Sequence, residues 1–206
     1  MKDLLSALLV LFLVTPAFAE RLSNPMTSME IATYKVRAAR SVMLLGAVDE
    51  NSAKQVDADF TRLNDTSNDP ITFIINSNGG RVDYGIDIIY SMQRSLAPVT
   101  CLIVGNALSM GAIIATFCPK LYVLKDSIIL FHPYQCVLFD VVRVPCIGPL
   151  YDRGLQALDK AIARRLGIEL AEYLERKNDP DMWVFDAEDA IMMGFASVLI
   201  DEIVFQ

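Results

Sequence analysis

One serine and the only histidine of the chain could together carry out nucleophilic chemistry. Ser109 lies among small residues in the stretch GNALSMGA (residues 105–112), and His132 follows further along the chain. A serine at a sharp turn between a strand and a helix exposes its hydroxyl, and an imidazole is a common base for activating it. The alternative is structural, with Ser109 as a helix N-cap and His132 as an ordinary half-buried ring.

A second glycine-rich loop has the residue types needed to bind an oxyanion. Residues 76–80 read NSNGG and follow an apolar segment. Paired glycines let the backbone turn its N–H groups outward, and acyl transfer needs such donors to stabilise a tetrahedral intermediate. A plain strand-to-helix turn would also use two glycines. A phosphate-binding loop is not supported, because no Gly-Lys-Ser/Thr sequence follows.

Both loops lie in a chain that alternates short apolar strands with amphipathic helices. The pattern predicts strands at 41–46, 71–75, 99–104, 121–124, 128–131 and 198–204, and helices at 51–63, 82–96, 109–117, 150–166, 169–177 and 187–193. A nearly all-apolar strand such as 71–75 is typical of a sheet covered on both faces. This alternation predicts an α/β domain in which functional loops gather at the carboxyl ends of the strands.

The first 19 residues have the pattern of a secretory signal peptide. A charged start is followed by a short apolar run, Pro16 and the Ala-Phe-Ala sequence that ends at Ala19. We expect a signal peptide at 1–19, one domain over 20–206, and an exported protein, periplasmic or secreted. An uncleaved membrane anchor is the alternative, although the run is short for a membrane span. The net charge of −7 without a basic cluster argues against nucleic acid as a partner.

The four cysteines would lie in an oxidising compartment if the chain is exported. Cys136 and Cys146 flank a segment that reads as a hairpin or looped excursion, so we favour a disulfide between them. Cys101 lies in an apolar strand and Cys118 at the end of an apolar helix, and we expect both to be buried free thiols. The cysteine spacings contain no CxxC pair, so we expect no metal site, and no cofactor is indicated.

The two glycine-rich loops and the histidine strand resemble the proteolytic subunit of the Clp protease (ClpP), a family of serine endopeptidases in the ClpP/crotonase superfamily. The family's Ile-Asn-Ser-Pro-Gly-Gly motif is matched by residues 75–80, with Asn78 in place of proline. Its Gly-x-Ala-x-Ser-Met-Gly-Ala motif is matched by residues 105–112, and its Ile-His-x-Pro sequence more loosely by residues 130–133. The similarity covers roughly residues 40–201.

This resemblance implies a repeated β-β-α fold with a protruding handle helix, for which residues 150–166 are the candidate. It implies Ser109 as the nucleophile and His132 as the general base and then the general acid. The backbone N–H groups of Gly80 and Met110 would form the oxyanion hole. Residues 136–148 depart from the family, which has a glycine-bearing substrate-binding strand there.

The acid that orients the histidine is harder to assign by resemblance. The family's Ala-x-x-Ala-x-x-x-Gly helix is matched by residues 187–194, and a match without gaps puts Met182 at the position of the aspartate. Anchoring on Trp183 with one inserted residue gives Asp181 instead, which we choose over Asp179. The alternative for either carboxylate is a solvated loop charge.

The resemblance implies a homo-oligomer, a heptameric ring or a pair of stacked rings, that cuts polypeptides. An exported enzyme would work in a compartment without ATP. We therefore expect it to act on short or unfolded polypeptides without a Clp-type ATPase partner. Two alternatives stay open. One is a catalytically inactive scaffold or chaperone-like ring, and the other is a Ser–Lys peptidase of the signal-peptide-peptidase type that uses Lys120, Lys125, Lys160 or Lys177.

Overall fold

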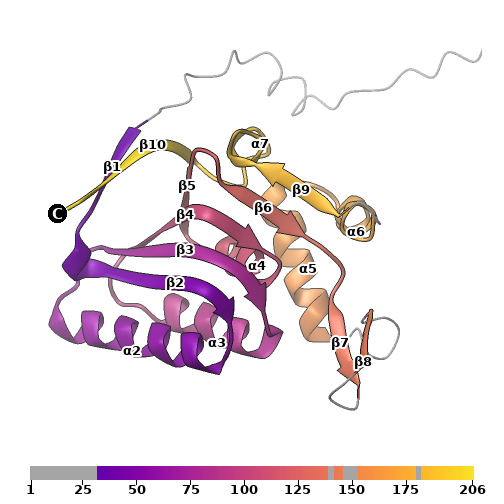
Figure 1. Ribbon diagram of the computed structural model, residues 1–206, viewed down its shortest axis with the longest axis horizontal. Helices are drawn as coiled ribbons and strands as arrows, with labels where there is room; N and C mark the ends of the chain where they lie inside the picture. Colours follow the sequence, from indigo (N-terminus) through magenta and orange to yellow (C-terminus); the bar gives the residue numbers. More distant parts are fainter. Residues whose placement is uncertain (1–31, 139–141, 146–152, 180–181) are drawn as a thin grey trace, which may run out of the picture.

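A mostly parallel β-sheet forms the centre of the molecule (Figure 1). The computed structural model describes residues 32–138, 142–145, 153–179 and 182–206. Along the sheet the strand order is β1 (Ala32–Val36), β10 (Val198–Phe205), β5 (Lys120–Leu124), β4 (Val99–Leu108), β3 (Ile71–Gly80) and β2 (Ser41–Val48). A further strand, β6 (Ile128–Phe131), pairs with β4 in parallel and with β9 (Trp183–Asp186) in antiparallel orientation. The predicted α/β class is confirmed.

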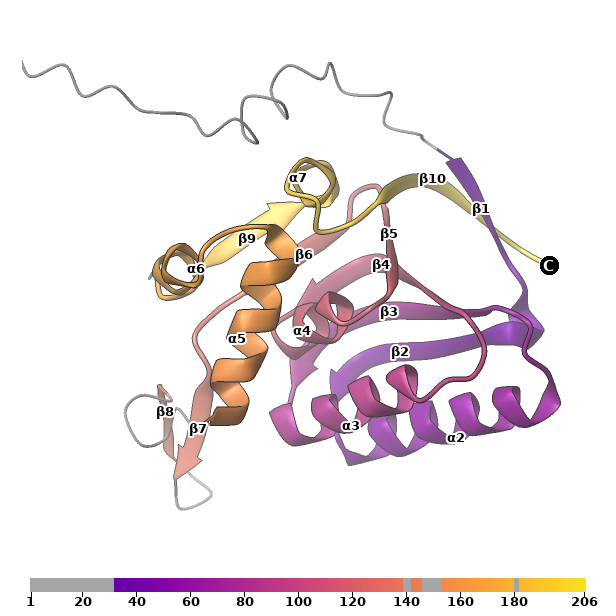
Figure 2. The same cartoon turned by 180° about the vertical axis from the view of Figure 1, so that it is seen from behind.

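The helices pack mainly on one face of this sheet. Figures 1 and 2 both show α2 (Glu50–Thr66) and α3 (Val82–Gln93) side by side along it, with α4 (Met110–Thr116) further along. The remaining helical elements are the short η1 (Ala38–Arg40), α5 (Arg153–Leu166), α6 (Leu170–Lys177) and α7 (Ala187–Met192). The predicted signal peptide at 1–19 lies outside the described residues. Among the residues described, no helix is long and apolar enough to cross a membrane.

The amino end of α2 shows how local sequence fixes an element. The Asp49 carboxylate accepts from the backbone N–H of Ser52, and the Ser52 hydroxyl accepts in return from the Asp49 N–H, each at 2.9 Å. This capping box satisfies donors that the first helical turn leaves without partners. One stripe of α2 is buried, formed by Ala53, Val56, Phe60 and Leu63. These are the residues whose helical spacing predicts the buried face.

Strand β3 is covered on both faces, as its apolar sequence predicts. Phe73 and Ile75 join the main core beneath the helices, whereas Ile74 belongs to a smaller cluster on the opposite face. That smaller cluster is formed by Val36, Ile74, Leu102 and Ile200. The second face is covered less completely at its edge, where Leu45 of β2 is 61% exposed.

Strands β1 and β9 were not predicted, and both depend on partners far away in the sequence. β1 pairs in parallel with β10 at the carboxyl end of the chain, and β9 pairs with β6. The predicted excursion after His132 contains an antiparallel hairpin of β7 (Gln135–Leu138) and β8 (Val142–Pro145). Both views show this hairpin near the start of α5.

Helix α5 has buried residues from Leu158 onward. Leu158, Asp159, Ile162, Ala163 and Leu166 are buried, while its first residues are exposed or half-buried. The structure describes it from residue 153, so the predicted start at 150 lies outside the described residues.

Cys101 and Cys118 form a disulfide, so the expectation of two free thiols is wrong. Helix α4 folds back over β4, and this reversal brings Cys118, two residues after the end of α4, to 6.0 Å from Cys101, measured between Cα atoms. Both cysteines are buried, and the Met92 sulfur of α3 lies 3.6 Å from each of their sulfurs. Cys146 and the side chain of Cys136 lie outside what the structure describes, so the Cys136–Cys146 bridge stays a prediction.

Candidate active site

Ser109 lies at the junction between β4 and α4 in an unusual backbone conformation. Its φ is 55° and its ψ is −119°, a conformation that costs an L-residue about 1–3 kcal/mol and persists only where the surroundings hold it. Its N–H donates to the Leu130 carbonyl at 2.8 Å, and its carbonyl accepts from the Ile113 N–H at 3.1 Å. The hydroxyl makes no capping hydrogen bond. The residue occupies the N-cap position, but its hydroxyl is left for another partner.

The Gly79-Gly80 loop packs directly against this turn. A Cβ atom on Gly79 would lie 2.5 Å from the Leu108 carbonyl oxygen and 2.7 Å from the Ser109 Cβ. The φ of Gly79 is +81°, so both its conformation and its surroundings require glycine. The buried Ser77 hydroxyl holds the loop, since it donates to the Gly46 carbonyl at 2.6 Å and accepts from the Gly79 N–H at 3.1 Å. The structure therefore brings the two predicted loops into contact.

His132 follows β6 and lies with its ring against Ser109. Its Nε2 is 2.8 Å from the Ser109 Oγ, and its Nδ1 is 2.6 Å from the Pro133 carbonyl oxygen. A carbonyl oxygen only accepts hydrogen bonds, so in the neutral ring Nδ1 carries the proton and Nε2 has the free lone pair. That lone pair faces the serine hydroxyl, which is the tautomer a general base requires.

An aromatic cluster anchors the strand that delivers His132. Phe131 contacts four other rings at centroid distances of 5.9–6.1 Å, those of Tyr173, Trp183, Phe185 and Phe195. Phe131 and Trp183 are also paired in the β6–β9 ladder. Packing from several elements therefore fixes the backbone just before the histidine.

The predicted oxyanion residues lie next to the serine and the loop. Met110 is the first residue of α4, where backbone N–H groups have no acceptor within the helix. A Cβ on Gly79 would be 2.8 Å from the Met110 nitrogen, and one on Gly80 would be 2.2 Å from the Val48 carbonyl oxygen. Gly79 therefore packs against Met110, and Gly80 packs against Val48 of β2. The oxyanion role of the Gly80 and Met110 N–H groups stays a prediction.

No contact between the predicted acid and the His132 ring can be described, because Asp181 lies outside the described residues. Asp179 is described and exposed just after α6. Among the described residues, the hydrogen-bond partners of the His132 ring are Ser109 and Pro133. Met182, the position that a match without gaps selects, is 52% exposed. The structure therefore gives Nδ1 a backbone acceptor and leaves the choice of Asp181 over Asp179 as a prediction.

Three of the four lysines predicted as alternative bases have other partners. Lys177 pairs with Asp159 at 2.6 Å, Lys125 pairs with Asp201, and the Lys120 ammonium lies 5.0 Å from the centre of the Tyr122 ring. Lys160 is exposed on α5. Within the described part of the chain, the Ser109 hydroxyl is bonded to His132 and to no lysine.

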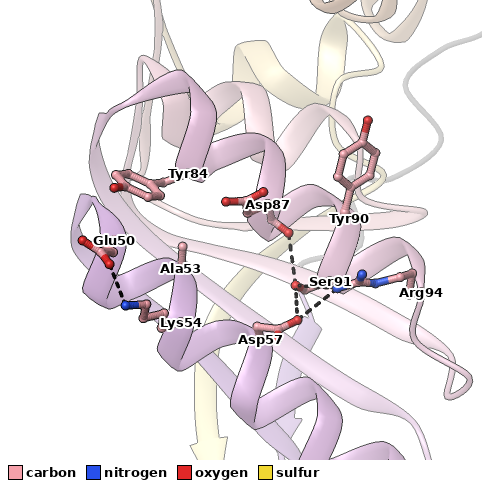
Figure 3. Close-up of a pocket in the computed structure, with 9 residues that line it drawn as sticks. All are labelled: Glu50, Ala53, Lys54, Asp57, Tyr84, Asp87, Tyr90, Ser91 and Arg94. Atoms are coloured by element: carbon pink, nitrogen blue, oxygen red, sulfur yellow. Dashed lines mark hydrogen bonds and ion pairs between the residues drawn. The ribbon is translucent and has the colours of Figure 1, made fainter.

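A hollow of about 340 Å³ lies between α2 and α3 (Figure 3). Four of its charged groups form two pairs: Lys54 with Glu50 at 2.6 Å and Arg94 with Asp57 at 3.1 Å. None of the predicted site residues lines it. Among the described residues, no three His, Cys, Asp or Glu side chains gather where they could hold a metal ion.

Sequence reasoning missed a buried polar cluster behind the histidine. The Tyr134 hydroxyl donates to Asp159 at 2.9 Å, and Lys177 donates to the other carboxylate oxygen at 2.6 Å. Burial lowers the pKa of Lys177, and the hydrogen bond to Asp159 partly offsets this effect. One signal was available: Asp159 lies four residues after Leu155 and three before Ile162, and so on the apolar stripe of its helix.

Comparison with known families identifies the class of protein. The profile of the Clp protease family matches residues 26–206. The chain is 30% identical over 165 residues to the ATP-dependent Clp protease proteolytic subunit 2 of Pseudomonas aeruginosa, covering 78% of this chain and 81% of the relative. It is also 30% identical over 179 residues to proteolytic subunit 1 of Protochlamydia amoebophila, covering 82% and 84%.

The solved structures agree with this result at the level of the fold. A single-residue mutant of ClpP1 from Listeria monocytogenes superposes with a TM-score of 0.66 at 21% identity, covering 80% of this chain and 92% of that one. The chain therefore belongs to the Clp protease family and has its mixed α/β fold. The resemblance seen in the two glycine-rich loops is confirmed at the level of the family.

Proposed function

We propose that the chain is a serine endopeptidase that uses Ser109 as nucleophile and His132 as general base. The observation that carries the proposal is the 2.8 Å hydrogen bond between the Ser109 Oγ and the His132 Nε2. Membership in a family whose relatives are named proteolytic subunits supports the same activity.

The geometry supports a two-step acyl transfer. His132 Nε2 takes the hydroxyl proton as the Ser109 Oγ bonds to the substrate's carbonyl carbon, and the N–H groups of Gly80 and Met110 stabilise the resulting oxyanion. The C–N bond then breaks, and His132 gives the proton to the leaving amine. Water, deprotonated by His132, next hydrolyses the acyl-enzyme and releases the peptide acid, which restores the serine.

Pro133 and Asp181 would share the support of the imidazole. The Pro133 carbonyl fixes the ring and its tautomer, but a neutral carbonyl stabilises an imidazolium less than a carboxylate does. We therefore keep Asp181 as the predicted acid of the triad, with Asp179 as the alternative.

The proposed substrates are short or unfolded polypeptides, cut without an ATPase partner. Export supports this restriction, because ATP is absent outside the cytoplasm. The Cys101–Cys118 disulfide supports export in turn, since disulfides persist in oxidising compartments. A homo-oligomeric ring is the assembly typical of the family, and we propose a heptameric ring or double ring for this chain.

The test is labelling and hydrolysis by the purified mature chain without ATP. A fluorophosphonate probe should label wild-type protein at Ser109, and a fluorogenic peptide and unfolded casein should be cut. Ser109→Ala and His132→Ala should abolish both reactions, with Ser41→Ala as a control for an exposed serine hydroxyl on β2. Wild-type protein that is folded but neither labels nor cuts would favour the inactive scaffold. Digestion of a stably folded substrate by the chain alone would contradict the substrate restriction.

A further inference from the structure

A buried ion pair contacts Tyr134, the residue two positions after His132. Asp159 of α5 is 0% exposed and Lys177 of α6 is 3% exposed. One carboxylate oxygen accepts from Lys177 at 2.6 Å, and the other accepts from the Tyr134 hydroxyl at 2.9 Å. The cluster thus joins two helices to the segment that follows the histidine.

Tyr134 is held by more than its hydroxyl. The Lys177 ammonium lies 4.3 Å from the centre of the Tyr134 ring and 5.4 Å from that of Tyr173. A cation over an aromatic face is attractive, most strongly where water is excluded. The tyrosine ring therefore has fixed partners at its face and at its hydroxyl.

The burial of the Asp159–Lys177 ion pair costs free energy, and this cost calls for an explanation. Burying two charges costs several kcal/mol per ion, and apolar side chains of similar volume often stabilise a fold as well or better. Stability alone therefore does not explain a lysine and an aspartate here. A geometric role explains them better. The Asp159 carboxylate has two defined donors and fixes the direction of the Tyr134 side chain, which an apolar contact would fix less well.

Tyr134 and Phe131 hold the His132 segment from both sides. Phe131 precedes the histidine and is anchored in the aromatic cluster, and Tyr134 follows Pro133 and is anchored to Asp159. Pro133 lies between these anchors, and its carbonyl accepts from the His132 Nδ1–H at 2.6 Å. The position of that carbonyl depends on Tyr134 because the two residues share a peptide bond.

We propose that Tyr134, Asp159 and Lys177 are positioning residues for His132. They hold the Pro133 carbonyl where it accepts the Nδ1 proton, and this keeps the Nε2 lone pair facing Ser109. The kinetic consequence of this inference rests on the proposed peptidase function. Its structural consequence is the tautomer of His132, which can be measured without any activity.

Tyr134→Phe is the decisive variant because it removes one oxygen atom and keeps the ring. Tyr34→Phe is the matched control, since Tyr34 bonds Thr72 at 3.1 Å between β1 and β3. We expect Tyr134→Phe to lower kcat at least about tenfold with KM nearly unchanged, because the base is misplaced while substrate contacts remain. Tyr34→Phe should leave kcat unchanged.

The single histidine makes the tautomer directly visible. In protein labelled with ¹⁵N in the imidazole and purified without a histidine tag, the wild type should show a protonated Nδ1 and an unprotonated Nε2. Tyr134→Phe should populate the other tautomer, and Tyr34→Phe should not. A Tyr134→Phe protein with wild-type kcat and a wild-type tautomer would overturn the inference and leave the peptidase proposal intact.

A second variant separates positioning from stability. Asp159→Leu combined with Lys177→Met replaces the ion pair by apolar groups and avoids the unpaired buried charge that either single variant would leave. It removes the acceptor of Tyr134, so kcat and the tautomer should change as in Tyr134→Phe. Full activity in this double variant would overturn the inference. Failure of wild-type protein to react at Ser109 would instead overturn the peptidase proposal, and the tautomer comparison would still decide the positioning role.

Discussion

Replacement of Gly79 by alanine should strongly slow the reaction at Ser109 without unfolding the protein. The new Cβ would lie 2.5 Å from the Leu108 carbonyl oxygen and 2.7 Å from the Ser109 Cβ, where ordinary contact begins at 3.4 Å. The backbone that carries the nucleophile must therefore retreat by nearly 1 Å. A misplacement of this size costs a reaction on the order of 100-fold, or about 2.7 kcal/mol of barrier.

Gly46→Ala is the matched control for the backbone strain. Gly46 has a φ of +82°, almost that of Gly79 at +81°, but nothing lies within 4 Å of a Cβ at Gly46. Both variants should lose about 1 kcal/mol of unfolding free energy from the left-handed conformation. Only Gly79→Ala also moves the serine.

The assay compares the second-order rate of fluorophosphonate labelling and kcat/KM on a fluorogenic peptide, with a thermal melt for each variant. Gly46→Ala should react within about threefold of the wild type. The reasoning is refuted if Gly79→Ala reacts as fast as Gly46→Ala, or if Gly46→Ala loses as much activity as Gly79→Ala.

Three further predictions follow from the cysteines, the carboxylates and Lys177. Cys101→Ala with Cys118→Ala should lower the unfolding free energy by about 3 kcal/mol, the entropy of closing a loop of this length; urea titration measures it, and no change would argue against the bridge in solution. Asp181→Asn should lower kcat on the order of 1,000-fold while Asp179→Asn stays within about threefold; equal kcat values would remove Asp181 from the triad. Burial lowers the pKa of Lys177 below its ordinary 10.5 in the folded state. Between that lowered pKa and 10.5 the unfolded chain holds more protons, so the unfolding free energy rises with pH across this window. Lys177→Arg stays charged throughout and should lose that part of the slope in urea titrations at increasing pH; parallel curves for both proteins would contradict the assigned cause.

The strands and helices with strong periodicity could be predicted from the sequence. The buried face of α2 and the two-sided burial of β3 follow from local patterns that survive in the fold. β1 and β9 could not be found this way, because their partners β10 and β6 are distant in the sequence and their own patterns are short. Long-range pairing decides such strands, and one sequence does not contain a signal for it.

The site residues that belong to sequence motifs could be predicted. The contacts that depend on tertiary packing could not. Small residues around Ser109 and paired glycines at 79–80 indicated a contact that the structure contains. The Cys101–Cys118 bridge was missed because the reversal from β4 into α4 sets its geometry, and spacing alone suggested another pair. Tyr134 was missed for a similar reason, since its partners Asp159 and Lys177 come from two later helices.

The Cys101–Cys118 bond turns the chain around Ser109 into a closed covalent ring. A cut anywhere between these two cysteines leaves both fragments joined, so a nicked molecule migrates as an intact one until it is reduced. Self-digestion at the nucleophile turn would therefore be invisible on a non-reducing gel. Peptide mapping of a labelled Ser109 must likewise begin with reduction, because the labelled peptide otherwise carries its cross-linked partner.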